Sequence, residues 1–127
     1  MNETRQTREG IRIHEPQDFH GMHAAGRIAA QILDEVGPLV VPGTTTGAID
    51  DYSRNRVTEL GTVSATIGYR GYQHASCISV NHVVCHGIPG DKILSDGDIL
   101  NIDVTVIADG WYGDSSRMYV AGKASVK

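Results

Sequence analysis

The sequence predicts a single α/β (α+β) domain in which two helices pack on an antiparallel sheet. Apolar side chains recur at three- and four-residue steps over residues 18–36, as they do on one face of a helix. Farther along, residues 99–107 alternate between apolar and polar side chains, and Asp109-Gly110 then supplies a strong hairpin signal. A chain of 127 residues can bury one hydrophobic core but is too short for a large multidomain assembly.

The charge and hydropathy of the chain exclude several classes of partner. Its 11 basic and 15 acidic residues give a net charge of −4, and the basic ones are scattered, so we expect no nucleic-acid partner. No apolar run approaches the ~20 residues of a membrane-spanning helix, and we expect no membrane partner. Residues 1–12 are polar and lack the apolar segment of a secretory signal, which predicts a flexible leader on a cytoplasmic protein. Cys77 and Cys85 form no C-x-x-C pair, and we expect reduced thiols.

Two helices are predicted in the first half of the chain. The first spans Asp18 to Val36, and Gly37-Pro38 ends it. The hydroxyl groups of Thr44 to Thr46 can cap a second helix that runs to about Leu60, where Gly61 provides a stop. The apolar face of the first helix consists of Phe19, Met22, Ala25, Ala29, Ile32, Leu33 and Val36.

Strands are predicted in the second half. A β-branched stretch from Ile78 to Val84 follows a loop of glycines and tyrosines at residues 68–72. The segment from Ile99 to Ile107 places aliphatic side chains on one side and polar ones on the other. We expect Trp111 to Val120 to return antiparallel to it.

The predicted hairpin brings two carboxylates together. If Asp109 and Gly110 form the turn, Asp103 lies opposite Ser116, and Asp114 lies opposite Thr105 on the same face. Diagonal neighbours have Cα atoms ~7–8 Å apart, so the two carboxylates can converge on a shared cation. They repel each other unless a proton or a metal compensates, and oxygen ligands suit Mg, Mn, Fe, Co or Zn. The alternative is that both aspartates simply face solvent.

His86 is the other candidate functional residue. His86 follows the apolar stretch, where a loop could turn it toward the aspartates, and neutral imidazole can donate, accept or ligate. His82 and His86 are four residues apart, but the glutamate of an H-E-x-x-H motif is absent and the segment is predicted as a strand, so we reject that motif. The nucleophile elbow of a serine hydrolase is also absent.

An ordered series of motifs resembles the type I methionine aminopeptidases. The resemblance runs from about Ile13 to Gly122. Its motifs are Val40-Val41-Pro42-Gly43-Thr44-Thr45-Thr46, Tyr69-Arg70-Gly71-Tyr72, Ser76-Cys77-Ile78-Ser79-Val80-Asn81, Val83-Val84-Cys85-His86-Gly87-Ile88-Pro89, Asp96-Gly97-Asp98-Ile99-Leu100-Asn101-Ile102-Asp103-Val104 and Gly110-Trp111-Tyr112-Gly113-Asp114.

The resemblance implies a fold and an activity. It implies the pita-bread aminopeptidase fold of two pseudo-symmetric halves, with residues 13–122 as the first half only, 1–12 as the leader and 123–127 as a truncated end. The family removes the initiator methionine from nascent proteins with two divalent metal ions, so the expected partner is a polypeptide with an N-terminal methionine and the expected cofactor is Co, Mn, Fe or Zn. A further histidine and two glutamate ligands are expected from a C-terminal half outside this chain.

The resemblance also assigns the candidate site residues. Asp103 and Asp114 are implied as metal ligands, with Asp114 bridging both ions. His86 is implied as the catalytic and substrate-binding histidine that steadies the tetrahedral intermediate.

The implied pocket for the methionine side chain is apolar and soft, as an unbranched thioether requires. Tyr69, Tyr72 and Cys77 match its wall. Thr66 stands at its rim, where many relatives have a cysteine, which leaves the detail of the pocket open.

Two other interpretations of the chain's function remain open. In one, the chain is a non-catalytic half-domain that acts as a metal-binding or interaction module. In the other, two copies associate and gather four aspartates around shared ions, in place of association with a C-terminal half. Prolidase-like peptidases share the implied fold, but the pocket motif at 69–77 and the motif at 86–89 point away from them.

Overall fold

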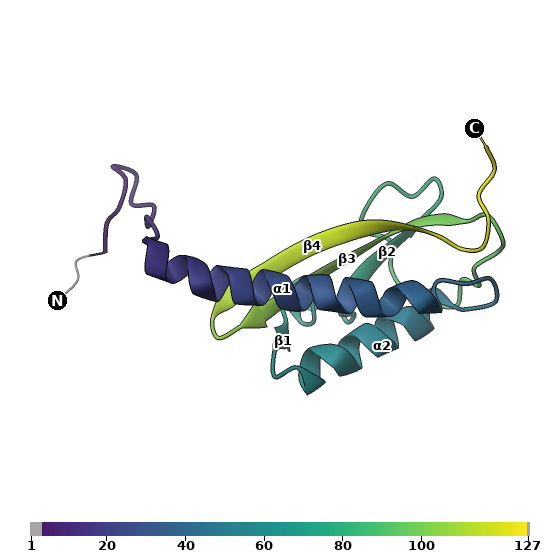
Figure 1. Cartoon of the computed structure of the whole chain (residues 1–127), viewed down its shortest axis with the longest axis horizontal. Coiled ribbons are helices and arrows are strands. Elements are labelled where there is room, and N and C mark those ends of the chain that lie inside the picture. Colours follow the sequence, from purple (N-terminus) through teal and green to yellow (C-terminus); the bar gives the residue numbers. More distant parts are fainter. Residues whose placement is uncertain (1–3, 127) are drawn as a thin grey trace.

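The computed structural model describes residues 4–126 and places two helices on one face of a four-stranded antiparallel sheet (Figure 1). The helices are α1 (Phe19–Val36) and α2 (Thr46–Glu59). The strands are β1 (Val63–Ser64), β2 (Ser76–Val80), β3 (Ile99–Ala108) and β4 (Trp111–Val120). Short 3-10 turns lie at Pro16–Asp18, Gly37–Leu39 and Tyr69–Gly71. The predicted class, two helices on an antiparallel sheet, is confirmed.

α1 lies directly on the sheet along most of its length. Its buried side chains belong to the predicted apolar face, but Phe19 and Met22 are exposed because the helix begins beyond the end of the sheet (Figure 1). The helix approaches β4 closely where β4 has no side chain. A Cβ at Gly113 would lie 2.2 Å from the backbone oxygen of Ala25, so only glycine allows this approach.

α2 begins and ends at the residues that the sequence predicts for its caps. The Thr45 hydroxyl accepts a hydrogen bond from the Ala48 amide at 3.1 Å, which satisfies one of the free amides of the first turn. Gly61 follows the last turn with a φ of +73°, a conformation that glycine adopts readily. The buried face of α2 includes Ile49 and Val57.

β3 is the central strand of the sheet. β4 pairs with its whole length, while β1 and β2 pair with different stretches of its other edge. Asp109 and Gly110 have φ values of +51° and +81°, the left-handed values of a type I′ turn. The predicted register is confirmed, since Asp103 lies opposite Ser116 and Asp114 lies opposite Thr105.

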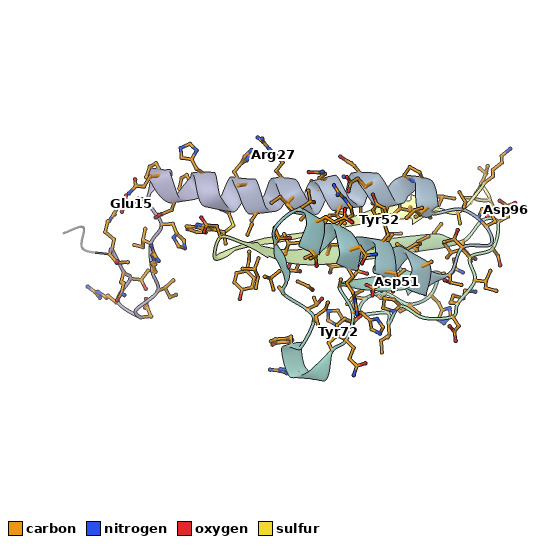
Figure 2. The ribbon with its side chains drawn as sticks, turned by 90° about the horizontal axis from the view of Figure 1, so that it is seen from below. Glu15, Arg27, Asp51, Tyr52, Tyr72 and Asp96 are labelled. Atoms are coloured by element: carbon orange, nitrogen blue, oxygen red, sulfur yellow. The ribbon has the colours of Figure 1, made fainter. Side chains whose placement is uncertain are left out.

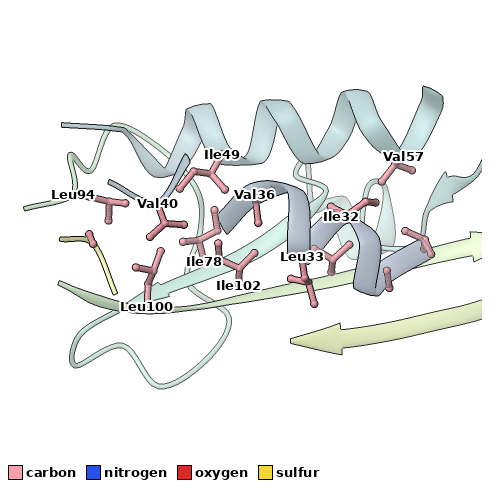
Figure 3. Packing of buried hydrophobic residues seen from close by; sticks show 14 residues of the cluster. Ile32, Leu33, Val36, Val40, Ile49, Val57, Ile78, Leu94, Leu100 and Ile102 are labelled. Carbon is pink, nitrogen blue, oxygen red and sulfur yellow. The ribbon is translucent and has the colours of Figure 1, made fainter. Parts of the chain in front are cut away.

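The two faces of β3 have different surroundings. Leu100, Ile102, Val104 and Val106 are fully buried and form the core with the apolar faces of the two helices (Figure 3). On the opposite, open face several apolar side chains stay exposed, namely Val63, Ile99, Tyr112, Met118 and Val120. This open face also carries Asp103 and Asp114.

One predicted strand is wrong in its bounds. Sequence propensity predicts a strand from Ile78 to Val84, but β2 is Ser76–Val80. The strand ends because Asn81 takes a φ of +53° and its side chain bonds elsewhere: the oxygen accepts from the Ile99 amide and the nitrogen donates to Asp98, both at 3.0 Å. His86 therefore lies on the following loop and not at a strand end.

The segment before α1 forms a short turn. Backbone hydrogen bonds join the Ile13 amide to Arg5 at 2.7 Å and the Thr7 amide to Ile11 at 2.9 Å. Residues 1–3 of the predicted leader lie outside the described residues. Among residues 4–126, no helix is long and apolar enough to cross a membrane.

Candidate metal and substrate site

Two carboxylates project from the open face of the sheet on adjacent strands. Asp103 on β3 is half-buried and Asp114 on β4 is exposed. The register makes them diagonal neighbours, and the Thr105 hydroxyl donates a hydrogen bond to Asp114 Oδ1 at 2.9 Å. Within residues 4–126, neither carboxylate forms a salt bridge. The structure thus brings together two negative side chains with no basic partner of their own.

The electrostatics of this pair favour a cation. Burial raises the pKa of Asp103 above its ordinary value, and the negative charge of Asp114 raises it further, while His86 opposes the shift. Both causes disfavour two ionised carboxylates side by side. A cation held between the two side chains would reverse that effect.

His86 reaches the same region from the loop that follows β2. The adjacent Gly87 fixes this loop, because its amide donates to the Ser79 hydroxyl at 3.0 Å and its oxygen accepts from the Ile78 amide at 2.9 Å. A Cβ at Gly87 would lie 2.2 Å from the Ile78 oxygen, so the approach requires glycine. His86 itself has a φ of +57°, an uncommon value for a residue with a side chain.

Tyr72 and Cys77 form a connected wall beside the carboxylates. Cys77 lies opposite Asp103 in the sheet, and its thiol donates to the Tyr72 hydroxyl across 3.6 Å. Burial, followed by the effect of Cys77, raises the pKa of Tyr72 well above its ordinary value. Tyr72 therefore stays protonated and donates to the backbone oxygen of Ser76 at 2.7 Å. Figure 2 shows Tyr72 on the loop that leaves the body of the molecule between β1 and β2.

The remaining wall residues lie on the same loop. Thr66 donates its hydroxyl hydrogen to the backbone oxygen of His74 at 2.6 Å. Tyr69 is exposed, and the guanidinium of Arg70 lies 5.4 Å from the centre of its ring. The side chains of Thr66 and Tyr69 line an open hollow and do not belong to the core.

This hollow, of about 620 Å³, brings together all seven residues that the resemblance assigns to the site. They are Thr66, Tyr69, Tyr72, Cys77, His86, Asp103 and Asp114. Sequence reasoning gave no role to four other residues that line it, Arg70, Gly71, Ile88 and Thr105. Thr105 could have been found from the register, which places it opposite Asp114 on the polar side of β3.

The carboxylates of Asp103 and Asp114 suit a divalent cation, but they supply only two ligand side chains. Carboxylate oxygens are ligands that Mg, Mn and Zn accept, and Asp103 and Asp114, as diagonal neighbours, are the two side chains that could hold such an ion. Within residues 4–126, no group of three or more His, Cys, Asp or Glu side chains could hold a metal. The described residues therefore offer two anionic ligands, and further ligands would have to come from outside them.

The fold and this donor set agree with a class of metal-dependent peptidases. The chain belongs to metallopeptidase family M24, which matches residues 20–127. Within that family, its sequence is similar to curated methionine aminopeptidases. It is 50% identical over 117 residues to the enzyme of Rickettsia prowazekii, covering 92% of this chain and 45% of that protein. It is 51% identical over 118 residues to the Escherichia coli K12 enzyme, covering 91% and 45%. The chain thus spans about half the length of the curated relatives that it matches.

Solved structures of methionine aminopeptidases are also similar to this chain. The crystal structure of methionine aminopeptidase from Rickettsia prowazekii has a TM-score of 0.87 at 50% identity and covers 89% of this chain and 46% of that one. The Thermotoga maritima methionine aminopeptidase has a TM-score of 0.85 at 36% identity, covering 90% and 46%. An X-Pro aminopeptidase from the same organism reaches 0.73 at 16% identity, covering 89% and 30%, and shows the shared fold alone. The pita-bread fold class and the resemblance to methionine aminopeptidases are confirmed.

Proposed function

We propose that this chain forms part of a methionine aminopeptidase and takes part in metal-dependent removal of the N-terminal methionine from nascent proteins. One observation carries the proposal: the carboxylate pair, His86 and the Tyr72–Cys77 wall all line one hollow. About 50% identity to curated methionine aminopeptidases supports this reaction over other peptidase chemistry. The proposed place of action is the cytoplasm, where nascent chains are made.

In this proposal Asp103 and Asp114 would hold the metal, and Asp114 would be the ligand common to two ions. Their oxygen atoms fit any of Co, Mn, Fe or Zn, so the identity of the ion is a matter for measurement. When bound, the ions supply Lewis-acid polarisation of the scissile carbonyl and activation of the attacking water. Thr105 keeps the Asp114 carboxylate in place through its 2.9 Å hydrogen bond.

The other residues bind the peptide. His86 can donate to or accept from the peptide backbone at the reacting carbonyl, and the Gly87 contacts hold its loop in position. Tyr69, Tyr72 and Cys77 receive the methionine side chain, with Thr66 at the rim. The polarisable thiol and the aromatic rings suit a thioether.

A second function is favoured by one specific observation, the absence within residues 4–126 of any metal-binding group of three or more side chains. A chain with only two ligands could act as a non-catalytic metal-binding or interaction module. Catalysis would need further ligands from outside residues 4–126, supplied by a C-terminal half or by a second copy. The exposed apolar residues of the open sheet face are where such a partner would pack.

Release of free methionine from a Met-Ala-Ser peptide distinguishes these cases. The chain is assayed with Mn²⁺, Co²⁺ or Fe²⁺, alone and mixed with the C-terminal half of the Rickettsia prowazekii enzyme. The proposal predicts release in at least one condition, loss of it in Asp103→Asn, and retention in Asp109→Asn, which changes a carboxylate at the hairpin tip. Activity of the chain alone would point to self-association, and activity of the mixture alone to a C-terminal partner. Inactivity in every condition would favour the non-catalytic module.

A further inference from the structure

Asp50 is a buried carboxylate that the proposed chemistry does not use. It lies on α2 with 1% of its surface exposed. A buried charge is costly unless it is paired and hydrogen-bonded, so its partners are informative. Ser76 donates its hydroxyl hydrogen to Asp50 Oδ1 at 2.6 Å, and His74 Nδ1 lies 3.2 Å from Asp50 Oδ2. Asp50 thus ties α2 to the segment that enters β2.

The partners of Asp50 adjoin the wall of the hollow. Successive residues of a strand point to opposite faces, so Ser76 faces α2 while the next residue, Cys77, faces the hollow. The His74 ring packs edge-on against the Tyr72 ring with the centroids 5.4 Å apart. The Tyr72 hydroxyl in turn donates to the Ser76 backbone oxygen at 2.7 Å.

Thr66, at the rim of the hollow, belongs to the same hydrogen-bond network. Thr66 donates to the backbone oxygen of His74, so the rim of the hollow is fixed to the residue that Asp50 holds. An ionised carboxylate can only accept hydrogen bonds, so the contact with Asp50 favours the His74 tautomer that carries a proton on Nδ1. Asp50 in this way sets both the position and the tautomer of the His74 ring, against which Tyr72 packs.

We propose that Asp50 is a positioning residue for the substrate pocket. Through Ser76 and His74 it fixes the Tyr72–Cys77 wall and the Thr66 rim, and it thereby sets the shape of the pocket that takes the unbranched methionine side chain. The occupant of the pocket rests on the proposed function. The role of Asp50 in holding the wall does not, because all of its contacts lie within this chain.

The reactivity of the Cys77 thiol tests this role without metal or substrate. In a Cys85→Ser background, Cys77 is the single thiol, and its rate of modification by Ellman's reagent reports how firmly the wall is closed. Loss of a buried hydrogen bond to a charged group eases local opening, so Asp50→Asn should react about ten-fold faster. Asp51→Asn makes the same change at the next, exposed position of α2 (Figure 2) and should react at the parent rate.

Two further variants separate positioning from general loss of stability. His74→Ala leaves the Asp50–Ser76 bond in place and should also speed Cys77 modification, which keeps the test available if Asp50→Asn does not fold. Val57→Ala removes core contacts from the same helix and should lower stability without a selective effect on Cys77. In ¹⁵N spectra, neutral His74 should be protonated at Nδ1 in the parent and should lose that preference in Asp50→Ala.

An unchanged Cys77 rate in folded Asp50→Asn and His74→Ala would overturn the proposal. So would an equal acceleration in Val57→Ala at matched stability. Neither result would bear on metal binding or peptide cleavage. Failure of the methionine-release assay, in turn, would leave the thiol result standing.

Discussion

Asp103 and Asp114 stand on neighbouring strands as diagonal partners, one opposite Ser116 and the other opposite Thr105. The left-handed turn at Asp109-Gly110 fixes that relationship, because a slip of one residue in the register would send one carboxylate to the core face. The site depends on this register. The same register places Thr105 where its hydroxyl can orient Asp114.

Thr105→Val removes the hydroxyl group that orients Asp114 while keeping the shape of the side chain. We expect the affinity for Mn²⁺ to fall by about ten-fold, because ligands lose their orientation when a supporting hydrogen bond is lost. Isothermal titration calorimetry measures the change. Ser116→Ala lies on the same face of the sheet and serves as the control. Equal affinities for Thr105→Val and the parent would show that the hydrogen bond has no part in metal binding.

Gly113→Ala and Gly26→Ala should change stability in opposite directions. At Gly113 a Cβ would meet the Ala25 backbone at 2.2 Å, which forces α1 away from β4 and should cost about 3 kcal/mol or more. At Gly26 a Cβ meets nothing within 4 Å, and alanine in a helix interior should stabilise by about 0.5–1 kcal/mol. Urea unfolding monitored by circular dichroism gives both values. A Gly113→Ala protein as stable as the parent would contradict the close contact.

Glu35 should make stability depend on pH in the acid range. Arg56 donates two hydrogen bonds to it, at 2.8 and 2.9 Å, and these lower the pKa of Glu35 below its ordinary 4.5. A carboxyl with a lowered pKa in the folded state stabilises the fold above its unfolded pKa, and this stabilisation is lost as the pH falls through the lowered value.

The comparison of parent and Glu35→Gln tests this dependence. The difference in their free energies of unfolding should be largest near neutral pH and should shrink below about pH 4.5. Glu9→Gln, which changes an exposed carboxylate before α1, is the control. A difference that stays constant with pH would show that the ion pair does not contribute.

The elements that could be predicted from the sequence are those set by local patterns. The apolar periodicity of α1, the Thr45 cap of α2 and the Asp109-Gly110 turn each lie within a few residues. From the turn alone, the register of β3 with β4 follows, and with it the pairing of Asp103 and Asp114.

The features that could not be predicted depend on contacts between distant segments. The β-branched residues after Val80 favour a strand, but Asn81 bonds to Asp98 and Ile99 from the far side of a loop and ends it. The placement of His86 depends on Gly87 meeting β2. Asp50 and its partners are 24 and 26 positions apart, and nothing in the local pattern connects them.

Binding of Mn²⁺ to this chain, followed by electron paramagnetic resonance of the free ion, measures whether the two aspartates form a metal site. If Asp103 and Asp114 together hold a divalent cation, the parent binds Mn²⁺, while Asp103→Asn and Asp114→Asn each bind it at least about ten-fold more weakly, because each loses an anionic ligand. Asp109→Asn should bind like the parent. Superimposable titrations for the parent and for both aspartate variants would show that Asp103 and Asp114 do not hold the ion.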